Sequence, residues 1–403
     1  MTGRRRILFI AEAATLAHIT RPLVLANGLN PEKYEVHFAS ADRYSMIFGT
    51  DRFRRWPLNS LATDKFLSRV ASGKPIFEYS VIREYVADDL ALFDKVKPDI
   101  VIGDLRLSLQ ISARIARIPY FSLVNAYWSP YARPNFVVPD HVLVRLFGAR
   151  IADAGFKLLA PLIMAMHTLP MNRARYHFGL PLVSQLQEVY TDADQVLYVD
   201  ASELIPTFDL PSNHHYLGPV VWSPRTPLPD WWSRLDPNRP CVYVTLGSSG
   251  DTHTLPTILA ALETEPVSVL VATAGRAGAL SLPRNAFVAD YLPGIDAAAR
   301  SALVICNGGS PTTLQALVSG VPVIGIASNL DQYLNIDYVE RAGAGRILRA
   351  EALTVSGLNA LCKLLLGDPM YKRSAATLQR QMTTYDPISR LEKFIDTLHG
   401  PTS

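Results

Sequence analysis

Short, continuous apolar runs alternate with helix-forming segments along most of this chain, and this alternation constrains the fold more than any other feature. The first runs lie at 6–11, 34–39, 99–104 and 118–124. A strand that is apolar on both faces is typical of a parallel sheet with helices on each side. Alternation of such strands with helices therefore predicts an α/β fold built on parallel sheets.

The alternation runs twice, which predicts two domains. A chain of 403 residues is also too long for one ordinary core. Between the two series, residues 219–240 include six prolines and three tryptophans, a stiff composition typical of a domain boundary. We predict an N-terminal domain over 1–220, a linker over 221–240, a C-terminal domain over 241–370 and C-terminal helices over 371–403.

The charge and the cysteine content argue against several classes of function. A net charge of +3 is small for this length, so charge alone implies no nucleic-acid partner. The three cysteines are far apart and form neither a disulfide framework nor a metal-ligand spacing. This usage favours a reducing, cytoplasmic location.

Two stretches have some features of a signal peptide or a membrane span. The basic Arg4-Arg5-Arg6 precedes an apolar run, as in a signal peptide, but Glu12 interrupts that run and a first strand explains it better. The most apolar stretch elsewhere, 156–166, contains Lys157 and Pro161. It falls short of the roughly 18 uninterrupted apolar residues of a membrane span, so we expect no transmembrane segment.

A glycine-rich turn at 306–311 joins an apolar run to a predicted helix over 312–319. Ser310 is the expected N-cap, and Pro311 occupies the first helical position, where its missing N–H costs nothing. Gly320 is expected to end the helix in the left-handed conformation. A strand, a turn and a helix N-terminus present backbone N–H groups and a positive dipole end, so we predict a pyrophosphate seat.

Two further polar turns follow strands of the second half, where doubly wound sheets bind ligands. The turn Gly247-Ser248-Ser249-Gly250 could donate to phosphate, although an ordinary turn between strand and helix would look the same. Asp331-Gln332 suits a ring of sugar hydroxyls. Asp331 could instead cap the helix that follows it.

Aromatic and aliphatic residues are frequent between 125 and 190, where the alternation is interrupted. This region is expected to line a cleft for a lipophilic ligand, with Tyr127, Trp128 and Phe136 as candidate contacts. Ordinary packing of helices against the sheet is the open alternative.

The second half resembles the donor signature of family 1 glycosyltransferases, which include bacterial macrolide and natural-product enzymes. Over about 55 residues, the resemblance is carried in order by 290–293, 307–317, 320–323, Asp331-Gln332, Asn335 and 343–345. It implies the GT-B fold, two facing Rossmann-like domains with a C-terminal helix that crosses back to the N-terminal domain. The N-terminal domain would hold the acceptor and the C-terminal domain a UDP- or dTDP-linked sugar.

The resemblance also implies a catalytic pair in the N-terminal domain. His18 matches the family's base after the first strand, and Asp104 matches its carboxylate partner at the end of a later strand. A neutral imidazole can remove the proton of an attacking hydroxyl, and a carboxylate behind it fixes the tautomer. Attack from the face opposite the nucleotide would invert the anomeric centre. Taken alone, His18 would more often be a structural histidine.

The donor residues follow from the same resemblance. Tyr291 and Leu292 are expected against the nucleobase, Gln315 near the ribose, and Asp331 and Gln332 on the sugar. The phosphates are assigned to Ser249, Asn307, Ser310 and Thr312, with Gly247, Ser248, Gly308 and Gly309 completing the site. No metal or other cofactor is expected, because a helix end and amides can take the charge of the leaving group.

Two positions depart from the family pattern. Asn307 stands where histidine is usual, and Pro311 where glycine is usual. A neutral amide gives up a charge-assisted hydrogen bond, a difference of about 1–2 kcal/mol.

We therefore expect a metal-independent, inverting glycosyltransferase, as a monomer or homodimer, that moves a hexose or deoxyhexose to a hydroxyl of a lipophilic small molecule. Two alternatives stay open. The first is a catalytically silent relative that binds a nucleotide sugar or a partner protein, suggested by Asn307. The second is a nucleotide-sugar epimerase, which shares the two-domain architecture.

Overall fold

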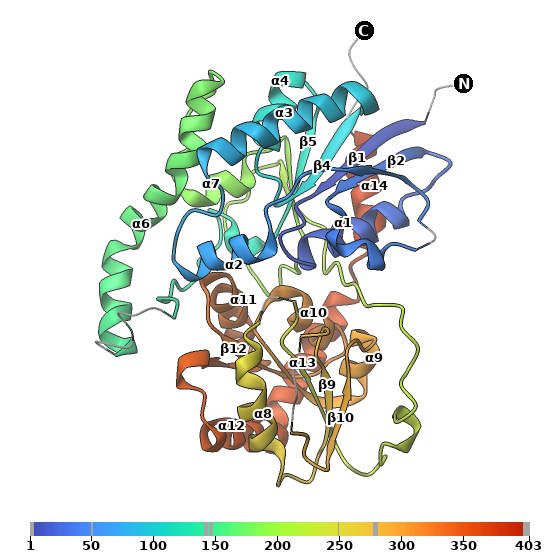
Figure 1. Cartoon of the computed structure of the whole chain (residues 1–403), viewed down its shortest axis with the longest axis vertical. Coiled ribbons are helices and arrows are strands. Elements are labelled where there is room, and N and C mark those ends of the chain that lie inside the picture. Colours follow the sequence, from blue (N-terminus) through green and yellow to red (C-terminus); the bar gives the residue numbers. More distant parts are fainter. Residues whose placement is uncertain are drawn as a thin grey trace. The chain divides into compact units, whose positions relative to one another are not determined.

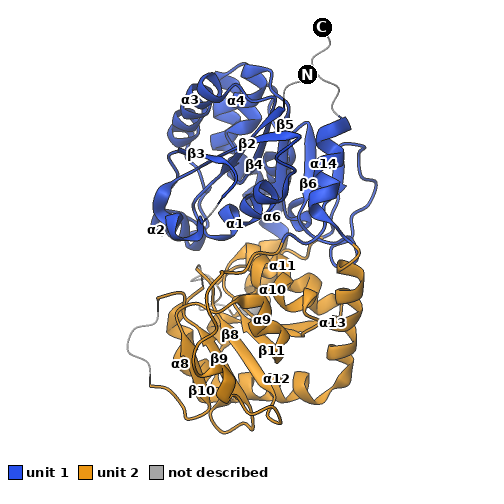
Figure 2. Cartoon of the chain, turned by 90° about the vertical axis from the view of Figure 1, so that its right-hand side faces the viewer, with its two compact units in different colours: residues 1–133, 158–220, 385–403 blue, residues 134–157, 221–384 orange. Residues whose placement is uncertain are grey.

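The computed structural model describes residues 4–49, 51–140, 144, 148–248, 250–276 and 281–397. The chain divides into two compact units, each a parallel sheet covered by helices (Figures 1 and 2). Unit 1 comprises 1–133, 158–220 and 385–403, and unit 2 comprises 134–157 and 221–384. The predicted α/β fold class is confirmed.

Unit 1 is organised around a parallel sheet, seven-stranded among the described residues, in the order β3-β2-β1-β4-β5-β6-β7. The strands are β1 (Arg5–Ala11), β2 (Tyr34–Ser40), β3 (Arg54–Pro57), β4 (Ile100–Asp104), β5 (Tyr120–Val124), β6 (Gln195–Tyr198) and β7 (His214–Tyr216). Its α-helices are α1 (Ala17–Gly28), α2 (Thr63–Ala71), α3 (Tyr79–Val96), α4 (Leu109–Ala116), α7 (Leu186–Thr191) and α14 (Pro387–Thr397), with most of α6 (Ala149–His177).

Unit 2 repeats the plan with a parallel sheet, six-stranded among the described residues, in the order β10-β9-β8-β11-β12-β13. The strands are β8 (Cys241–Thr245), β9 (Ser268–Ala272), β10 (Ala286–Ala289), β11 (Ser301–Cys306), β12 (Val323–Ala327) and β13 (Gly345–Arg349). The helices are α8 (Leu255–Leu262), α9 (Gly294–Ala299), α10 (Ser310–Val318), α11 (Leu330–Arg341), α12 (Val355–Gly367) and α13 (Pro369–Met382).

The strands form because their apolar side chains are buried on both faces. Ile7, Leu8, Phe9 and Ile10 of β1 are all fully buried, and alternate residues enter two different core clusters of unit 1. The strands β8, β9, β11 and β12 are buried in the same way in unit 2. Helices on each side of the sheets exclude water from both faces, as the continuous apolar runs predicted.

The strand order decides where a ligand can bind. In each unit the chain winds in one direction from the central strand and then reverses, between β1 and β4 in unit 1 and between β8 and β11 in unit 2. At such a reversal the loops after the two central strands separate, and a crevice opens at their carboxyl ends. The candidate site is therefore sought after β1 and β4, and after β8 and β11.

The packing units differ from the predicted domain boundaries in two segments. Residues 134–157 belong to unit 2, although the prediction placed them in the N-terminal domain. Of the predicted C-terminal helices over 371–403, the chain from 385 onward packs in unit 1, whereas α13 stays in unit 2. In unit 1, Tyr34 donates a hydrogen bond to Asp396 of α14 at 2.7 Å. The break at 386–387 thus separates two helices that pack on different sheets.

The helix α6 was not anticipated as one continuous element. Its segment Arg150–His177 is long and apolar enough to cross a membrane, by length and composition alone. Only 22% of the most apolar stretch of 18 residues within this segment is buried. Lys157 and Pro161 interrupt the run of roughly 18 apolar residues by which a membrane span was expected to be recognised.

Candidate functional site

The predicted pair of His18 and Asp104 meets at the reversal point of the unit 1 sheet. Asp104 is the last residue of β4 and is paired in register with Ala11, the last residue of β1. His18 Nδ1 lies 2.8 Å from Asp104 Oδ1, with the side chain of His18 21% exposed and that of Asp104 1% exposed. A hydrogen on Nδ1 facing the carboxylate leaves Nε2 as the basic nitrogen.

His18 lies on a helix and not in the loop before it. The prediction started this helix at Arg21 because Pro22 suits a first turn, but α1 begins at Ala17 and contains Pro22 in its interior. Proline lacks the N–H that would bond to the carbonyl four residues earlier, which here is that of His18. The helix therefore tolerates Pro22 with one missing hydrogen bond.

Arg21 is a functional residue that sequence reasoning missed. Its Nε donates to Asp104 Oδ2 at 2.8 Å and its Nη2 to Asp104 Oδ1 at 2.7 Å, a two-pronged contact. Nη2 also lies 3.0 Å from His18 Nδ1. Burial lowers the pKa of Arg21, but the charge of Asp104, the hydrogen bonds to its carboxylate and the charges of Tyr127 and Asp200 together outweigh burial, so the pKa is raised and the guanidinium stays charged. The spacing of His18 and Arg21 on one helix, three residues apart, was the available signal.

The contacts continue to the ends of the next two strands. Arg21 Nη1 donates to Asn125 Oδ1 at 2.5 Å, and Asn125 Nδ2 donates to Asp200 Oδ1 at 3.0 Å. The Ala126 backbone N–H donates to the other oxygen of Asp200 at 2.6 Å. Asn125 follows β5 and Asp200 follows β6, so the loops after four neighbouring strands converge. We call His18, Arg21, Asp104, Asn125 and Asp200 the Arg21 network.

The three predicted acceptor contacts belong to different units. Tyr127 and Trp128 form a short 3₁₀ helix, η2 (Ala126–Trp128), in unit 1, whereas Phe136 belongs to unit 2. Tyr127 is fully buried, which fits the packing alternative for that ring. Trp128 is half-buried and stacks on Tyr190 with ring centroids 4.9 Å apart.

In unit 2, two backbone N–H groups of the glycine-rich turn after β11 are hydrogen-bonded within the turn. Gly308 has φ of +78°, which favours glycine. Its N–H donates to Cys306 Sγ at 3.3 Å, and the N–H of Gly309 donates to Asn307 Oδ1 at 3.2 Å. The expectation that the turn offers both amides to an anion is thus corrected, because neighbouring side chains accept them. The contribution to an anion site falls to the start of α10.

The start of α10 also differs by one residue from the prediction. The helix begins at Ser310, and Gly309, in an extended conformation, is the N-cap residue in place of Ser310. Gly320 ends the segment with φ of +67°, as predicted. Ser310 is buried and Thr312 is half-buried, both in the first turn, where the helix dipole is positive.

Neighbouring elements hold this turn in place. Asn335 of α11 donates through Nδ2 to the Gly308 carbonyl at 2.7 Å and to Thr313 Oγ1 at 2.9 Å. Gly250, after β8, packs so closely that a Cβ there would lie 3.1 Å from Asn307 Cβ. The turns after β8 and β11 are therefore in contact at the reversal point of the unit 2 sheet.

The turn after β8 contacts a cation that the sequence did not point to. Gly247 has φ of +62°, and its carbonyl accepts a hydrogen bond from Arg276 Nη1 at 3.3 Å. Arg276 is exposed and follows β9. Ser248 is half-buried beside it, and Ser249 lies outside the described residues.

The other residues predicted to bind the nucleotide sugar differ in how exposed their side chains are. Tyr291 is exposed, but Leu292 is buried in the core, so only its backbone could face a nucleobase. Gln315 Nε2 donates to the Trp222 carbonyl at 2.7 Å, which holds the amide in place.

The Asp331-Gln332 pair lies in the first turn of α11. Asn329 is the N-cap and forms a capping box with Gln332, so the alternative that Asp331 caps this helix is wrong. Gln332 Oε1 accepts from the Ser328 N–H at 2.9 Å, so only Nε2 of its amide could address a sugar. Asp331 is exposed beside it.

Among the described residues, no group of three or more His, Cys, Asp or Glu side chains could hold a metal ion. The sites described above instead combine a buried acid–base network in unit 1 with a helix N-terminus and a nearby cation in unit 2. Such groups can move a proton and receive a diphosphate.

Known proteins resemble this chain in sequence and in fold. Residues 254–389 match the family model described as erythromycin biosynthesis protein CIII-like, C-terminal domain. A PGL/p-HBAD biosynthesis rhamnosyltransferase of Mycobacterium bovis (strain BCG / Pasteur 1173P2) is 49% identical over 376 residues, covering 93% of this chain and 84% of that protein. A protein of the same strain named inactive PGL/p-HBAD biosynthesis glycosyltransferase is 45% identical over 260 residues, covering 64% of this chain and 71% of that protein.

Solved structures show the same fold. The spinosyn forosaminyltransferase SpnP superimposes with a TM-score of 0.71 at 19% identity, covering 98% of this chain and 100% of that chain. The Streptomyces sp. SF2575 glycosyltransferase SsfS6, complexed with thymidine diphosphate, gives a TM-score of 0.69 at 19% identity, with coverage of 98% and 100%.

Proposed function

The chain belongs to the glycosyltransferase family that includes the mycobacterial PGL/p-HBAD biosynthesis enzymes, and on this premise we propose that it transfers a hexose or deoxyhexose from a nucleoside-diphosphate sugar to a hydroxyl of a lipid-like acceptor. The contact between His18 Nδ1 and Asp104 Oδ1 carries the proposal, because it orients an imidazole as a base. A related protein is named a rhamnosyltransferase, which favours a deoxyhexose, and SsfS6 was solved with thymidine diphosphate, which favours a dTDP-linked donor.

In the proposed reaction, His18 Nε2 takes the proton of the acceptor hydroxyl as its oxygen attacks the anomeric carbon. The bond to the diphosphate breaks on the opposite face, so the anomeric centre inverts. Within the Arg21 network, the guanidinium cancels the charge of Asp104, and buried Asp200 adds a second negative charge. Protonation of His18 then brings the formal charge of the network from −1 to zero.

Unit 2 would bind the donor. The first turn of α10 suits the diphosphate, with Ser310 and Thr312 as hydroxyl donors, and Asp331 and Gln332 suit the sugar. Asn307 addresses the leaving group as a neutral amide. Gly247, Ser248, Gly308 and Gly309 shape the two turns, and Tyr291 offers its exposed ring to the base. No metal ion is required by this scheme.

The test is incubation of the full chain with UDP- and dTDP-linked sugars and with phenolic acceptors that have short or long alkyl chains. We expect release of nucleoside diphosphate and an acceptor with an inverted glycosidic bond, measured by coupled assay and NMR. Donor binding without release on any acceptor would contradict transfer and would group the chain with its inactive relative. Interconversion of donor sugars in the absence of acceptor would instead indicate an epimerase.

We expect Arg276 to supply the positive charge that Asn307 lacks. Arg276→Gln should weaken binding of the nucleoside diphosphate by about 10- to 150-fold, since a hydrogen bond to a charged group contributes about 1.5–3 kcal/mol. Isothermal titration measures the effect, and Arg239→Gln, an exposed arginine of the same unit, is the control. Addition of Asn307→His to Arg276→Gln should restore part of the affinity. Equal affinities in all four proteins would show that neither position contacts the diphosphate.

A further inference from the structure

One face of α6 presents a continuous row of large apolar side chains to solvent. Leu158 is 81% exposed, Leu162 61%, Met166 55%, Leu169 61% and Tyr176 81%. Their spacing of three, four and seven residues places all five on one side of the helix. We call these five residues, all in unit 1, the α6 stripe.

The opposite face of α6 is held by unit 1. Met164, Met171 and Ala174 are buried there. Asn172 Nδ2 donates to the Val183 carbonyl and Asn172 Oδ1 accepts from the Val183 N–H, both at 2.9 Å. Arg175 donates to Gln110 Oε1 at 2.7 Å and forms an ion pair with Asp192. A membrane-spanning α6 would lose all these contacts, so only the stripe is available to a partner.

The charges along α6 are mostly positive. From 150 to 177 the chain has Arg150, Lys157, Arg173 and Arg175 against the single acid Asp153, whose carboxylate accepts from the Val138 N–H at 2.8 Å.

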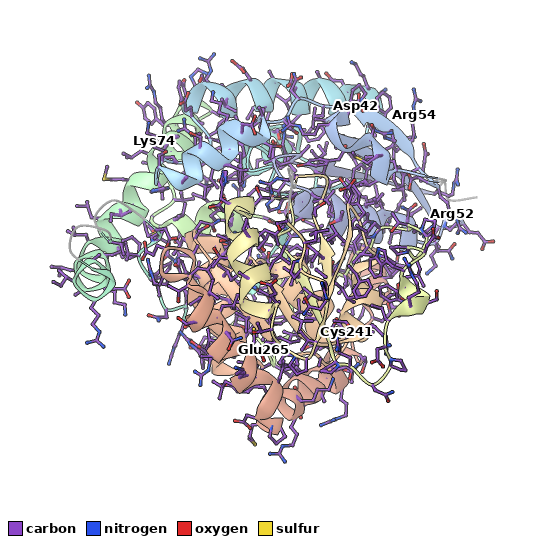
Figure 3. All side chains as sticks on the ribbon, turned by 60° about the horizontal axis from the view of Figure 1, so that its bottom comes forward. Asp42, Arg52, Arg54, Lys74, Cys241 and Glu265 are labelled. Atoms are coloured by element: carbon purple, nitrogen blue, oxygen red, sulfur yellow. The ribbon has the colours of Figure 1, made fainter. Side chains whose placement is uncertain are left out.

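The loop before α3 adds a cation close to α6. His167 of α6 hydrogen-bonds the backbone of Gly73, next to exposed Lys74, which Figure 3 labels near α6. The guanidinium of Arg173 lies 4.4 Å from the ring centroid of Tyr79, the first residue of α3. Lys157 and Arg173 of α6, and Lys74 next to Gly73, are exposed cations.

We propose that the α6 stripe docks the protein on an anionic lipid surface, with the helix lying in the plane of the interface. The apolar side chains would enter the boundary of headgroups and acyl chains, and the flanking lysines and arginine would face anionic headgroups. A second copy of the chain fits less well, because two such faces would bring cations against cations. The inference extends the proposed function, since a lipid-like acceptor is delivered at such a surface, but its test uses neither donor nor acceptor.

The test is co-sedimentation of the full chain with vesicles of phosphatidylcholine, with and without phosphatidylglycerol. Binding is expected with the anionic vesicles and is expected to be reversed in about 1 M salt, where the screening length falls to about 3 Å. The variant Leu158→Gln/Leu162→Gln/Leu169→Gln should bind at least about 10-fold more weakly. Lys74→Glu/Lys157→Glu should lose about as much.

The control is Leu364→Gln/Met370→Gln, which removes two exposed apolar side chains of unit 2 and should bind as the wild type does. Unchanged melting temperatures establish that each variant is folded. Undiminished vesicle binding by the stripe variant would overturn the proposal, and so would wild-type binding that withstands high salt. It would also be overturned if neither protein bound vesicles and sedimentation velocity showed a wild-type dimer that is a monomer in the stripe variant. Loss of sugar transfer with intact vesicle binding would count against the proposed function alone.

Discussion

His18→Ala is expected to lower kcat for sugar transfer by about 100- to 10,000-fold, the range that a positioned general base contributes. The reason is the contact of His18 Nδ1 with Asp104 Oδ1 at 2.8 Å, which directs the basic Nε2 toward the acceptor hydroxyl in the proposed reaction. The measurement is release of nucleoside diphosphate at saturating donor and acceptor. Affinity for the diphosphate should be unchanged, because the proposed donor residues lie in unit 2.

A matched control is His177→Ala, which removes an exposed histidine of the same unit. It should keep full turnover on a short-chain acceptor. Asp104→Asn should also lower kcat, because the amide no longer fixes the Nδ1–H tautomer. Wild-type turnover in His18→Ala would show that His18 is not the base and that the Arg21 network has a structural role only.

Arg21→Met is expected to destabilise unit 1 by about 3–5 kcal/mol, the usual cost of removing one partner of a buried ion pair. Arg21 bonds both oxygens of Asp104, whose side chain is almost fully buried, and it also bonds Asn125. Its removal leaves the carboxylate desolvated without its guanidinium. The shift in the midpoint of urea unfolding measures this effect.

A double-mutant cycle separates the ion pair from loss of packing. Arg21→Met/Asp104→Asn should be clearly less destabilised than the sum of the two single variants, because the second change removes the unpaired charge. Arg21→Lys should recover little of the loss, since a lysine cannot form the two-pronged contact. Additive effects would mean that the contact between Arg21 and Asp104 contributes no coupling energy.

Much of the fold could be predicted because the signals are local. Strands such as β1 and β9 are continuous apolar runs, and Gly320 marks the end of α10 with a left-handed conformation. The strand β13 has a weaker local signal, because its sequence, Gly-Arg-Ile-Leu-Arg, has charged residues at two of five positions. At the edge of the sheet such a strand needs less burial, so its pattern is weaker.

The candidate site was predictable only in part. His18 and Asp104 could be chosen through a family resemblance, and the structure brings their side chains into contact. Asn125 and Asp200 gave no sign of their connection, because each is an ordinary polar residue after a strand. The glycine-rich turn was located correctly. However, the hydrogen bond from the Gly309 N–H to Asn307 Oδ1 depends on the rotamer of Asn307, which the sequence does not specify.

By itself, the sequence determined the α/β class, the two parallel sheets and the position of the turn after β11. The signals for these features are local: a continuous apolar run indicates a strand that is buried on both faces, and the residues next to a helix end indicate where the helix begins. The tertiary structure alone decided that Arg21 donates to both oxygens of Asp104 and that one face of α6 stays exposed. The Arg21 network joins residues as far apart as 18 and 200 in the chain. Such contacts exist only once the strand order has brought the loops after β1, β4, β5 and β6 to one edge of the sheet.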